Sequence, residues 1–303
     1  MIFGKEEAMK KLRTVALVAL AGAAILIGCG GTSAPSKKIG LAISTLNNPF
    51  FVTLKEGAEA KAKELGYELV VTDAQDDPAK QAGQIDDLIQ KKVGVILLNP
   101  CNSDAAKTMV EKATKAKIPV ISVDRGVNGA TVLSHIASDN VAGGVMAGQE
   151  LLALVGQGAK VVELQGIPGA SATVDRGTGF HQAVDGKLNV AVSQSADFNR
   201  DKGFTVMQNI IQANKDIKGV FAHNDEMALG AVQALEAAGM KTVAVIGFDA
   251  TDDAVAAVKV GRMKATVAQK PALIGSMAVD TAVKYLKGET VPAKIPVPLE
   301  LVK

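Results

Sequence analysis

The sequence predicts an α/β protein with parallel sheets, helices on both faces of each sheet, and two similar domains. From Lys38 onward, short runs of β-branched and apolar residues alternate with longer segments rich in Ala, Lys and Glu, which is the pattern of a strand–helix repeat. A chain of 303 residues has room for about two domains. Ten expected strands are too many for one strongly twisted sheet, but they fit two sheets of about five or six.

Strands are expected where the apolar runs are short. In chain order they are Ile39–Ser44, Tyr67–Thr72, Gly94–Leu98, Val120–Val123, Val132–Ala137, Lys160–Leu164, Val190–Ser193, Gly219–Ala222, Val243–Gly247 and Ala265–Ala268. Helices are expected between most of them, for example at about Val52–Leu65, Ala79–Lys91, Asp104–Lys117, Gly203–Ala213 and Met227–Ala238. Because the crossovers between parallel strands are nearly always right-handed, the carboxyl ends of the strands in a sheet point to one edge.

Composition and charge argue against one class of partner. Hydrophobic residues make up 48% of the chain and charged residues 21%, which are ordinary values for a soluble globular protein. The formal charge is +2, and the first 28 residues alone supply +2 from four basic and two acidic side chains, so the remainder is neutral. A neutral body without basic runs does not predict nucleic-acid binding. The two cysteines, Cys29 and Cys101, do not indicate a disulfide framework.

The first residues predict an export signal. A basic cluster precedes the apolar run Thr14–Ile27, which is too short to cross a bilayer. The run leads into Leu-Ile-Gly-Cys, ending at Cys29, which resembles a bacterial lipobox. We therefore expect residues 1–28 to be a lipoprotein signal peptide, Cys29 to carry lipid on the outer face of the cell membrane, and residues 29–37 to be a flexible tether. The alternative is an ordinary signal peptide that is cut elsewhere.

Polar residues follow most of the expected strands, and an aromatic pair follows the first. The polar residues are Asn48, Asp73, Asn99, Asp124, Arg125, Asp197, Asn224, Asp249 and Gln269. Ligands bind at the carboxyl edge of open α/β sheets, so these residues are expected to surround one rim, although Asp73 is interpreted as a helix cap or loop residue. Carboxylates, amides and guanidinium groups pair with neighbouring hydroxyls, while Phe50 and Phe51 can cover the C–H face of a sugar ring. Alternatively, the two phenylalanines begin a helix and fill the core.

Several motifs resemble those of a known family. They are the segment 44–51, Asn99-Pro100, Asp124-Arg125, the segment 134–140, Asp175-Arg176-Gly177, Ala196-Asp197-Phe198, the segment 224–230, Gly247-Phe248-Asp249 and Ala268-Gln269. Together they resemble the ribose-binding members of the type I periplasmic solute-binding protein family of bacterial ABC uptake systems. The resemblance covers nearly everything from Lys38 to the C-terminus.

This resemblance implies two similar doubly wound parallel-sheet domains joined by a three-segment hinge, the periplasmic binding protein type I fold. It implies an N-terminal lobe of residues 38–138 plus 270–297 and a C-terminal lobe of residues 139–269 plus 298–303. Ligand contacts are implied at the matching motif positions, which are Asn48, Phe50, Phe51, Asn99, Asp124, Arg125, Arg176, Phe198, Asn224, Asp249 and Gln269.

The resemblance also implies a function. The protein is expected to capture a monosaccharide, D-ribose before other pentoses, hexoses and furanose-like molecules, and to deliver it to an ABC transporter permease. A monomer is expected, with no cofactor, metal or nucleic acid, and docking on a chemoreceptor is left open. The chain departs from the family pattern at Val174, where Arg is frequent, at His223 in place of Gln, and at Ala250 in place of Gly.

Other interpretations exist for single residues and for the whole chain. Arg176 could pair with Asp175 on a solvated helix face, and Asp249 could cap a helix. An enzyme is disfavoured because the sequence has neither a Gly-x-Ser-x-Gly elbow nor a phosphate-binding loop motif. A transcriptional repressor with the same two-domain core would carry a helix-turn-helix where this chain has its predicted export signal.

Overall fold

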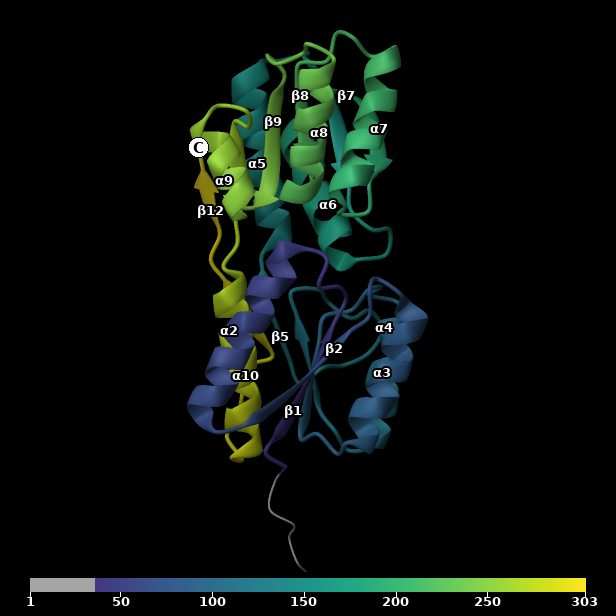
Figure 1. The fold of residues 1–303 in the computed structure, drawn as a ribbon, viewed down its shortest axis with the longest axis vertical. Helices are drawn as coiled ribbons and strands as arrows, with labels where there is room; N and C mark the ends of the chain where they lie inside the picture. The colour runs from purple at the N-terminus through teal and green to yellow at the C-terminus, as the bar shows by residue number, and fades with distance from the viewer. Residues whose placement is uncertain (1–35) are drawn as a thin grey trace, which may run out of the picture. The chain divides into compact units, whose positions relative to one another are not determined.

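The computed structural model describes residues 36–303, which form two α/β lobes, each built on a six-stranded sheet (Figure 1). The predicted signal segment, the predicted lipidation site at Cys29 and most of the predicted tether lie outside the described residues. Within residues 36–303, no helix is both long and apolar enough to span a membrane.

The N-terminal lobe has a wholly parallel sheet in the order β11-β5-β4-β3-β1-β2. Its strands are β1 (Lys38–Ile43), β2 (Glu68–Asp73), β3 (Val95–Leu98), β4 (Val120–Val123), β5 (Ser134–Ser138) and β11 (Lys294–Val297), and its helices are α2 (Pro49–Leu65), α3 (Pro78–Gln90), α4 (Ala106–Lys115) and α10 (Pro271–Leu286). Leu41 packs in the core beneath α2 and α10, whereas its neighbour Ala42 packs beneath α3 and α4. Burial on both faces explains the continuous apolar runs.

The C-terminal lobe has a sheet in the order β12-β10-β9-β8-β6-β7. Its strands are β6 (Lys160–Gln165), β7 (Asn189–Ser195), β8 (Gly219–Ala222), β9 (Ala244–Asp249), β10 (Ala265–Ala268) and β12 (Glu300–Val302), and its helices are α5 (Asn140–Val155), α6 (Ser171–Val184), α7 (Arg200–Ala213), α8 (Asp225–Ala237) and α9 (Asp252–Lys259). Along β6, Leu164 packs toward α7 and α8, whereas Val161 packs toward α5 and α6. This sheet is therefore also covered on both faces.

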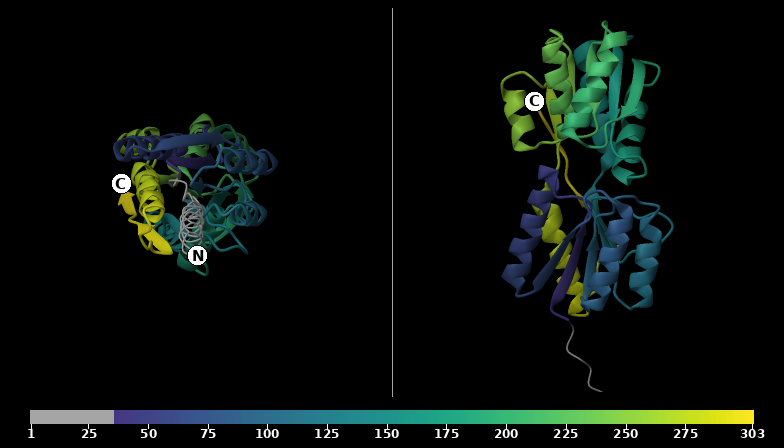
Figure 2. Two further views of the ribbon diagram at one scale, coloured as in Figure 1. Left: turned by 90° about the horizontal axis from the view of Figure 1, so that it is seen from below. Right: turned by 45° about the vertical axis from the view of Figure 1, so that its right-hand side comes forward.

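The chain passes between the two sheets at three places. It leaves the N-terminal sheet after β5, returns after β10 and leaves again after β11. The last of these passages is visible as the yellow segment between the lobes in Figure 2. On its return the chain forms α10, which packs closely on α2 because Gly275 has no side chain: a Cβ there would lie 2.0 Å from the carbonyl oxygen of Leu54.

The fold confirms the predicted class, but the sequence analysis missed two strands and placed the starts of α2 and α7 three residues too late. β11 has four residues including Pro296, and β12 has three, so neither shows a clear apolar run. Among the described strands, β12 and β10 form the one antiparallel pair. Helix α2 begins at Pro49 instead of near Val52, because Asn48 caps it and proline is favourable in the first turn.

Candidate functional site

The start of α2 supplies one wall of a gap between the lobes. The side-chain oxygen of Asn48 accepts a hydrogen bond from the backbone N–H of Phe50 at 3.0 Å, which fixes the amide at the helix N-terminus. The rings of Phe50 and Phe51 meet edge to face, with centroids 5.2 Å apart. Both rings are almost fully buried and belong to the core cluster of the lobe. The pair therefore begins a helix, fills the core and lines the gap at the same time.

The ends of β3 and β4 supply a carboxylate and a guanidinium. Asp124 has a φ of +63°, a left-handed conformation that is unfavourable for a residue with a side chain. The amide of Asn99 donates to the Val123 carbonyl at 3.0 Å and to Asp124 Oδ2 at 3.3 Å, and its oxygen accepts from the Ser44 hydroxyl at 2.7 Å. These contacts hold Asp124 in place and leave its Oδ1 without a protein partner.

Arg125 connects the two lobes through aromatic contacts. Its guanidinium carbon lies 5.1 Å from the ring centroid of Phe51 in α2 and 5.3 Å from that of Phe198 in the loop before α7. Its Nη1 donates to the carbonyl oxygen of Pro100 at 3.2 Å, and its buried Nε has no protein acceptor. Contacts of this kind between a buried cation and aromatic rings are favourable by about 1–2 kcal/mol.

Arg176 is the central cation of the C-terminal lobe. Its Nε donates to Asn140 Oδ1 at 2.8 Å, and its Nη1 donates to the backbone carbonyl of His223 and lies 3.8 Å from Asp249 Oδ1. The guanidinium also lies over the ring of Phe248, 3.9 Å from its centroid. Only 3% of Arg176 is exposed, so the interpretation that it sits on a solvated helix face is wrong.

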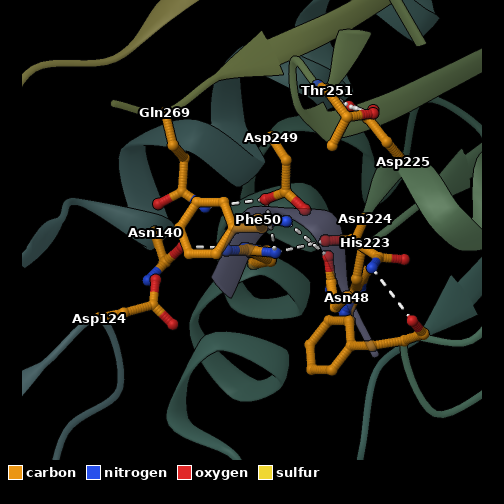
Figure 3. A network of polar contacts seen from close by, with 12 residues as sticks. Asn48, Phe50, Asp124, Asn140, His223, Asn224, Asp225, Asp249, Thr251 and Gln269 are labelled. Carbon is orange, nitrogen blue, oxygen red and sulfur yellow. Dashed lines mark hydrogen bonds and ion pairs between the residues drawn. The ribbon is translucent and has the colours of Figure 1, made fainter. Parts of the chain in front are cut away.

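Asp249, Gln269 and Asn224 complete the polar side of the gap, as Figure 3 shows. Asp249 Oδ1 accepts from the Gln269 amide at 2.9 Å, while Gln269 Oε1 has no protein partner. Asn224 caps α8 by accepting from the Met227 N–H, and it donates to the Phe198 carbonyl at 3.2 Å. The alternative role of Asp249 as a helix cap is wrong, because the residue in the N-cap position of α9 is Thr251.

The gap is small and is lined by residues from both lobes. Its volume is about 10 Å³, and it is lined by Asn48, Phe50, Phe51, Asp124, Arg125, Ala172, Arg176, Phe198, Asn224 and Asp249. Nine of the predicted contacts therefore lie around it, and Gln269 adjoins it through Asp249. The prediction that Asn99 contacts the ligand needs correction. Its amide hydrogens and its oxygen are used by protein groups, and it lies behind Asp124.

The buried charges favour an uncharged ligand with many hydroxyl groups. Burial raises the pKa of Asp124, and the nearby Arg176 and Arg125 oppose this effect. Burial likewise raises the pKa of Asp249 well above its usual range, against the charge of Arg176. With both carboxyl groups ionised, two carboxylates and two guanidinium groups line the gap and their charges balance, so the site gains little from an ionised ligand. Among residues 36–303, no cluster of His, Cys, Asp and Glu is arranged to hold a metal ion.

Sequence reasoning missed two residues that hold Arg176. Asn140 accepts its Nε–H, and His223 accepts through a backbone carbonyl. Asn140 lies in one of the motifs that carry the family resemblance, which was a usable signal. A backbone carbonyl has no sequence signature, so the contact with His223 could be found only in the structure.

The sequence matches the periplasmic binding protein domain family over residues 39–290. The chain belongs to this family. Its members are solute-binding transport proteins and not enzymes. The chain is 52% identical over 296 residues to the ribose import binding protein of Salmonella typhimurium, with 97% of this chain and 98% of the relative covered. It is 51% identical over 263 residues to the ribose import binding protein of Bacillus subtilis, with 87% and 86% covered.

Solved structures of other family members superpose closely. An ABC transporter solute-binding protein from Mycobacterium smegmatis with bound glycerol has a TM-score of 0.85 and 36% identity, covering 88% of this chain and 94% of that one. The Caulobacter myo-inositol-binding protein with bound myo-inositol also has a TM-score of 0.85, with 32% identity and coverage of 88% and 93%. These similarities confirm the predicted periplasmic binding protein type I fold.

Proposed function

We propose that this protein is an extracytoplasmic lipoprotein that captures D-ribose between its lobes and delivers it to the permease of an ABC transporter. The main support is that nine predicted ligand contacts line one interlobe gap. Identities of 51% and 52% to ribose import binding proteins, over nearly the whole chain, favour ribose within the range of sugars that such a site could hold.

The chemistry of the gap supports a sugar ring. Asp124 Oδ1 and Gln269 Oε1 are buried acceptors without a protein donor, and Arg125 Nε is a buried donor without an acceptor. A hydroxyl group both donates and accepts, so a ring with several hydroxyls can satisfy all three.

Ligand capture would follow from contacts on both lobes. Asp124 and Arg125 follow a strand of the N-terminal sheet, whereas Arg176 and Asp249 belong to the C-terminal lobe. We propose that residues 38–138 plus 270–297 and residues 139–269 plus 298–303 move as two bodies about the three connecting segments. A sugar that contacts both bodies binds the closed arrangement more tightly than the open one, and it shifts the equilibrium by that difference.

A thermal-shift panel of pentoses and hexoses tests the ligand assignment. A ligand present at 100 times its dissociation constant stabilises the native state by about 2.7 kcal/mol, which raises the melting temperature. We expect the largest rise with D-ribose and none in the Arg176→Ala variant. A larger rise with another sugar would replace ribose with that sugar, and no rise with any sugar would overturn the proposal.

The lipid anchor and the partners require separate tests. Mass spectrometry of protein extracted from membranes should show a chain that begins at Cys29 and carries lipid there, whereas Cys29→Ser should yield unlipidated soluble protein. An unmodified wild-type protein would contradict the anchor.

We also propose that the sugar-bound monomer docks on the permease, with a chemoreceptor as a second partner. Crosslinking to each partner with and without sugar would test this.

A further inference from the structure

A carboxylate is buried inside the C-terminal lobe, away from the sugar gap. Glu163 lies on β6 with an exposure of 0%, on the strand face opposite to Val162 and Leu164. Its Oε2 accepts from the Gln165 amide at 2.9 Å, and His181 Nε2 lies 3.5 Å from the same oxygen. A buried carboxylate needs such donors, because burial without them is strongly unfavourable. The proposed sugar contacts do not explain why it is there.

The strongest partner of Glu163 is His223, which follows β8. The Nε2 atom of His223 lies 2.9 Å from Glu163 Oε1, and neither residue is exposed. His223 Nδ1 has no partner. A neutral ring that donates from Nε2 fits this arrangement, because a proton on Nδ1 would be a buried donor without an acceptor. Burial lowers the pKa of His223, which favours the same neutral form.

The pair lies directly beneath Arg176. The backbone carbonyl of His223 accepts from Arg176 Nη1. The next residue in α6, Gly177, covers both members of the pair: a Cβ there would lie 3.4 Å from Glu163 Oε1 and 3.4 Å from the His223 ring. The His223 imidazole is therefore hydrogen-bonded to Glu163 on β6, while the main-chain carbonyl of His223 accepts a hydrogen bond from the Arg176 guanidinium.

We propose that Glu163 and His223 are a positioning pair that sets the Arg176 guanidinium for the sugar. By holding the imidazole, Glu163 fixes the main chain at residue 223, and this main chain orients Arg176 Nη1 while Asn140 orients its Nε. The inference rests on the proposed sugar-binding function only for its affinity readout.

Protonation of His223 should disturb the position of Arg176. The charged groups around His223 are Glu163 on β6, Arg176 and His181 on α6, and Asp225 at the start of α8. Protonation would add a cation close to Arg176 and a buried N–H without an acceptor at Nδ1. The position of the 223 carbonyl would then be less well defined, and because burial lowers the pKa of His223, sugar affinity should fall at a pH below the usual histidine pKa of about 6.5.

Three variants separate positioning from general stability. His223→Leu removes the donor to Glu163, His223→Gln keeps an N–H donor of similar reach, and Phe221→Leu is the control. The control removes the ring that lies 5.2 Å from the imidazole but leaves every polar contact of the pair. We expect His223→Leu to bind sugar about tenfold more weakly and His223→Gln to stay within about threefold of wild type. Phe221→Leu should melt earlier with unchanged affinity.

Two further readouts keep the inference testable. In ¹⁵N-arginine NMR spectra, the Nε–H signal of Arg176, assigned by its loss in Arg176→Lys, should exchange faster with solvent in His223→Leu than in Phe221→Leu. This measurement needs no ligand, so it remains decisive even if ribose does not bind. As the pH is lowered below about 6.5, the wild-type affinity should also fall more steeply than that of His223→Gln, in which Asp225 and Asp249 titrate as before.

Three outcomes would overturn the inference. These are equal sugar affinity in His223→Leu and wild type, equal exchange of the Arg176 Nε–H in His223→Leu and Phe221→Leu, or parallel pH profiles for wild type and His223→Gln. If His223→Leu does not fold, the pH profiles and the Arg176 signal of His223→Gln decide. In that variant the signal should stay protected at a pH low enough for the wild type to lose protection.

Discussion

The backbone N–H of Ser171, the first residue of α6, donates a hydrogen bond of 3.1 Å to the hydroxyl of Ser103, in the loop before α4. Two neighbouring bonds support it: Ser103 N–H donates to the Gly169 carbonyl at 2.9 Å, and Gly126 N–H donates to the Ser171 hydroxyl at 2.8 Å. Each joins the N-terminal lobe to the C-terminal lobe, and none involves a residue that lines the sugar gap. The lobes therefore hold each other directly as well as through their proposed ligand.

Ser103→Ala should weaken sugar binding without removing a sugar contact. It deletes one interlobe hydrogen bond, worth about 0.5–1.5 kcal/mol, so the closed arrangement becomes less populated and affinity falls by roughly two- to tenfold. The loss should appear mainly as faster dissociation in stopped-flow measurements. Thr108→Ala, which removes a hydroxyl from the exposed face of α4, is the matched control. Unchanged dissociation in Ser103→Ala would show that this contact does not stabilise closure.

Arg176→Ala should cost the most affinity of any single change at the site. The substitution removes the buried cation beside Asp249 and leaves Asn140 Oδ1 without its donor, so we expect a loss of about 3 kcal/mol, or roughly 100-fold. Arg176→Lys should recover little, because a single ammonium cannot reproduce the planar fork. Titration calorimetry gives the values, and Arg262→Ala, which breaks an exposed pair with Glu236, is the control. Near wild-type affinity in Arg176→Ala would refute its assignment.

Asn99→Ala should reduce both stability and affinity, although Asn99 does not line the gap. Without its amide, Asp124 Oδ2 and the Val123 carbonyl each lose a buried donor, which should lower the unfolding free energy by about 1–3 kcal/mol. Affinity should fall as well, because Asp124 loses its orientation. Urea denaturation and calorimetry measure the two effects. Asn128→Ala, at an exposed pair with Asp104, should change neither. A loss of stability with full affinity would mean that Asp124 needs no such support.

Asp225→Asn should change how stability depends on pH. Burial raises the pKa of Asp225 from 3.8 to about 7, against hydrogen bonds from Thr266 and Thr251. Between those values the folded state keeps a proton that the unfolded state has released, so the contribution of this group to stability falls as pH rises from about 4 to about 7. Relative to wild type, Asp225→Asn should gain at least about 1 kcal/mol between pH 5 and pH 7.5 in urea denaturation. A difference that does not vary with pH would contradict this.

The sequence was sufficient for the features that depend on pattern and insufficient for those that depend on main-chain geometry. Strands buried on both faces read as apolar runs, and polar residues after them, such as Asp124 and Asp249, had to share one edge of a sheet. The role of Asn99 could not be read in the same way. An asparagine at this strand end can contact either the ligand or Asp124, and the sequence is the same in both cases.

The two missed strands show a second limit. Residues of β11 and β12 have too little apolar character to be found by pattern, since the strands form at the edges of sheets that already exist. The hydrogen bond from Arg176 to the backbone carbonyl of His223 shows a third limit. A carbonyl acceptor is common to every residue type, so neither composition nor spacing could reveal it.

The positions of β11 and β12 make both lobes depend on one short segment. Each sheet receives one edge strand from residues between Lys294 and Val302. A cleavage within this segment would therefore uncover the edge of β5 in one sheet and the edge of β10 in the other.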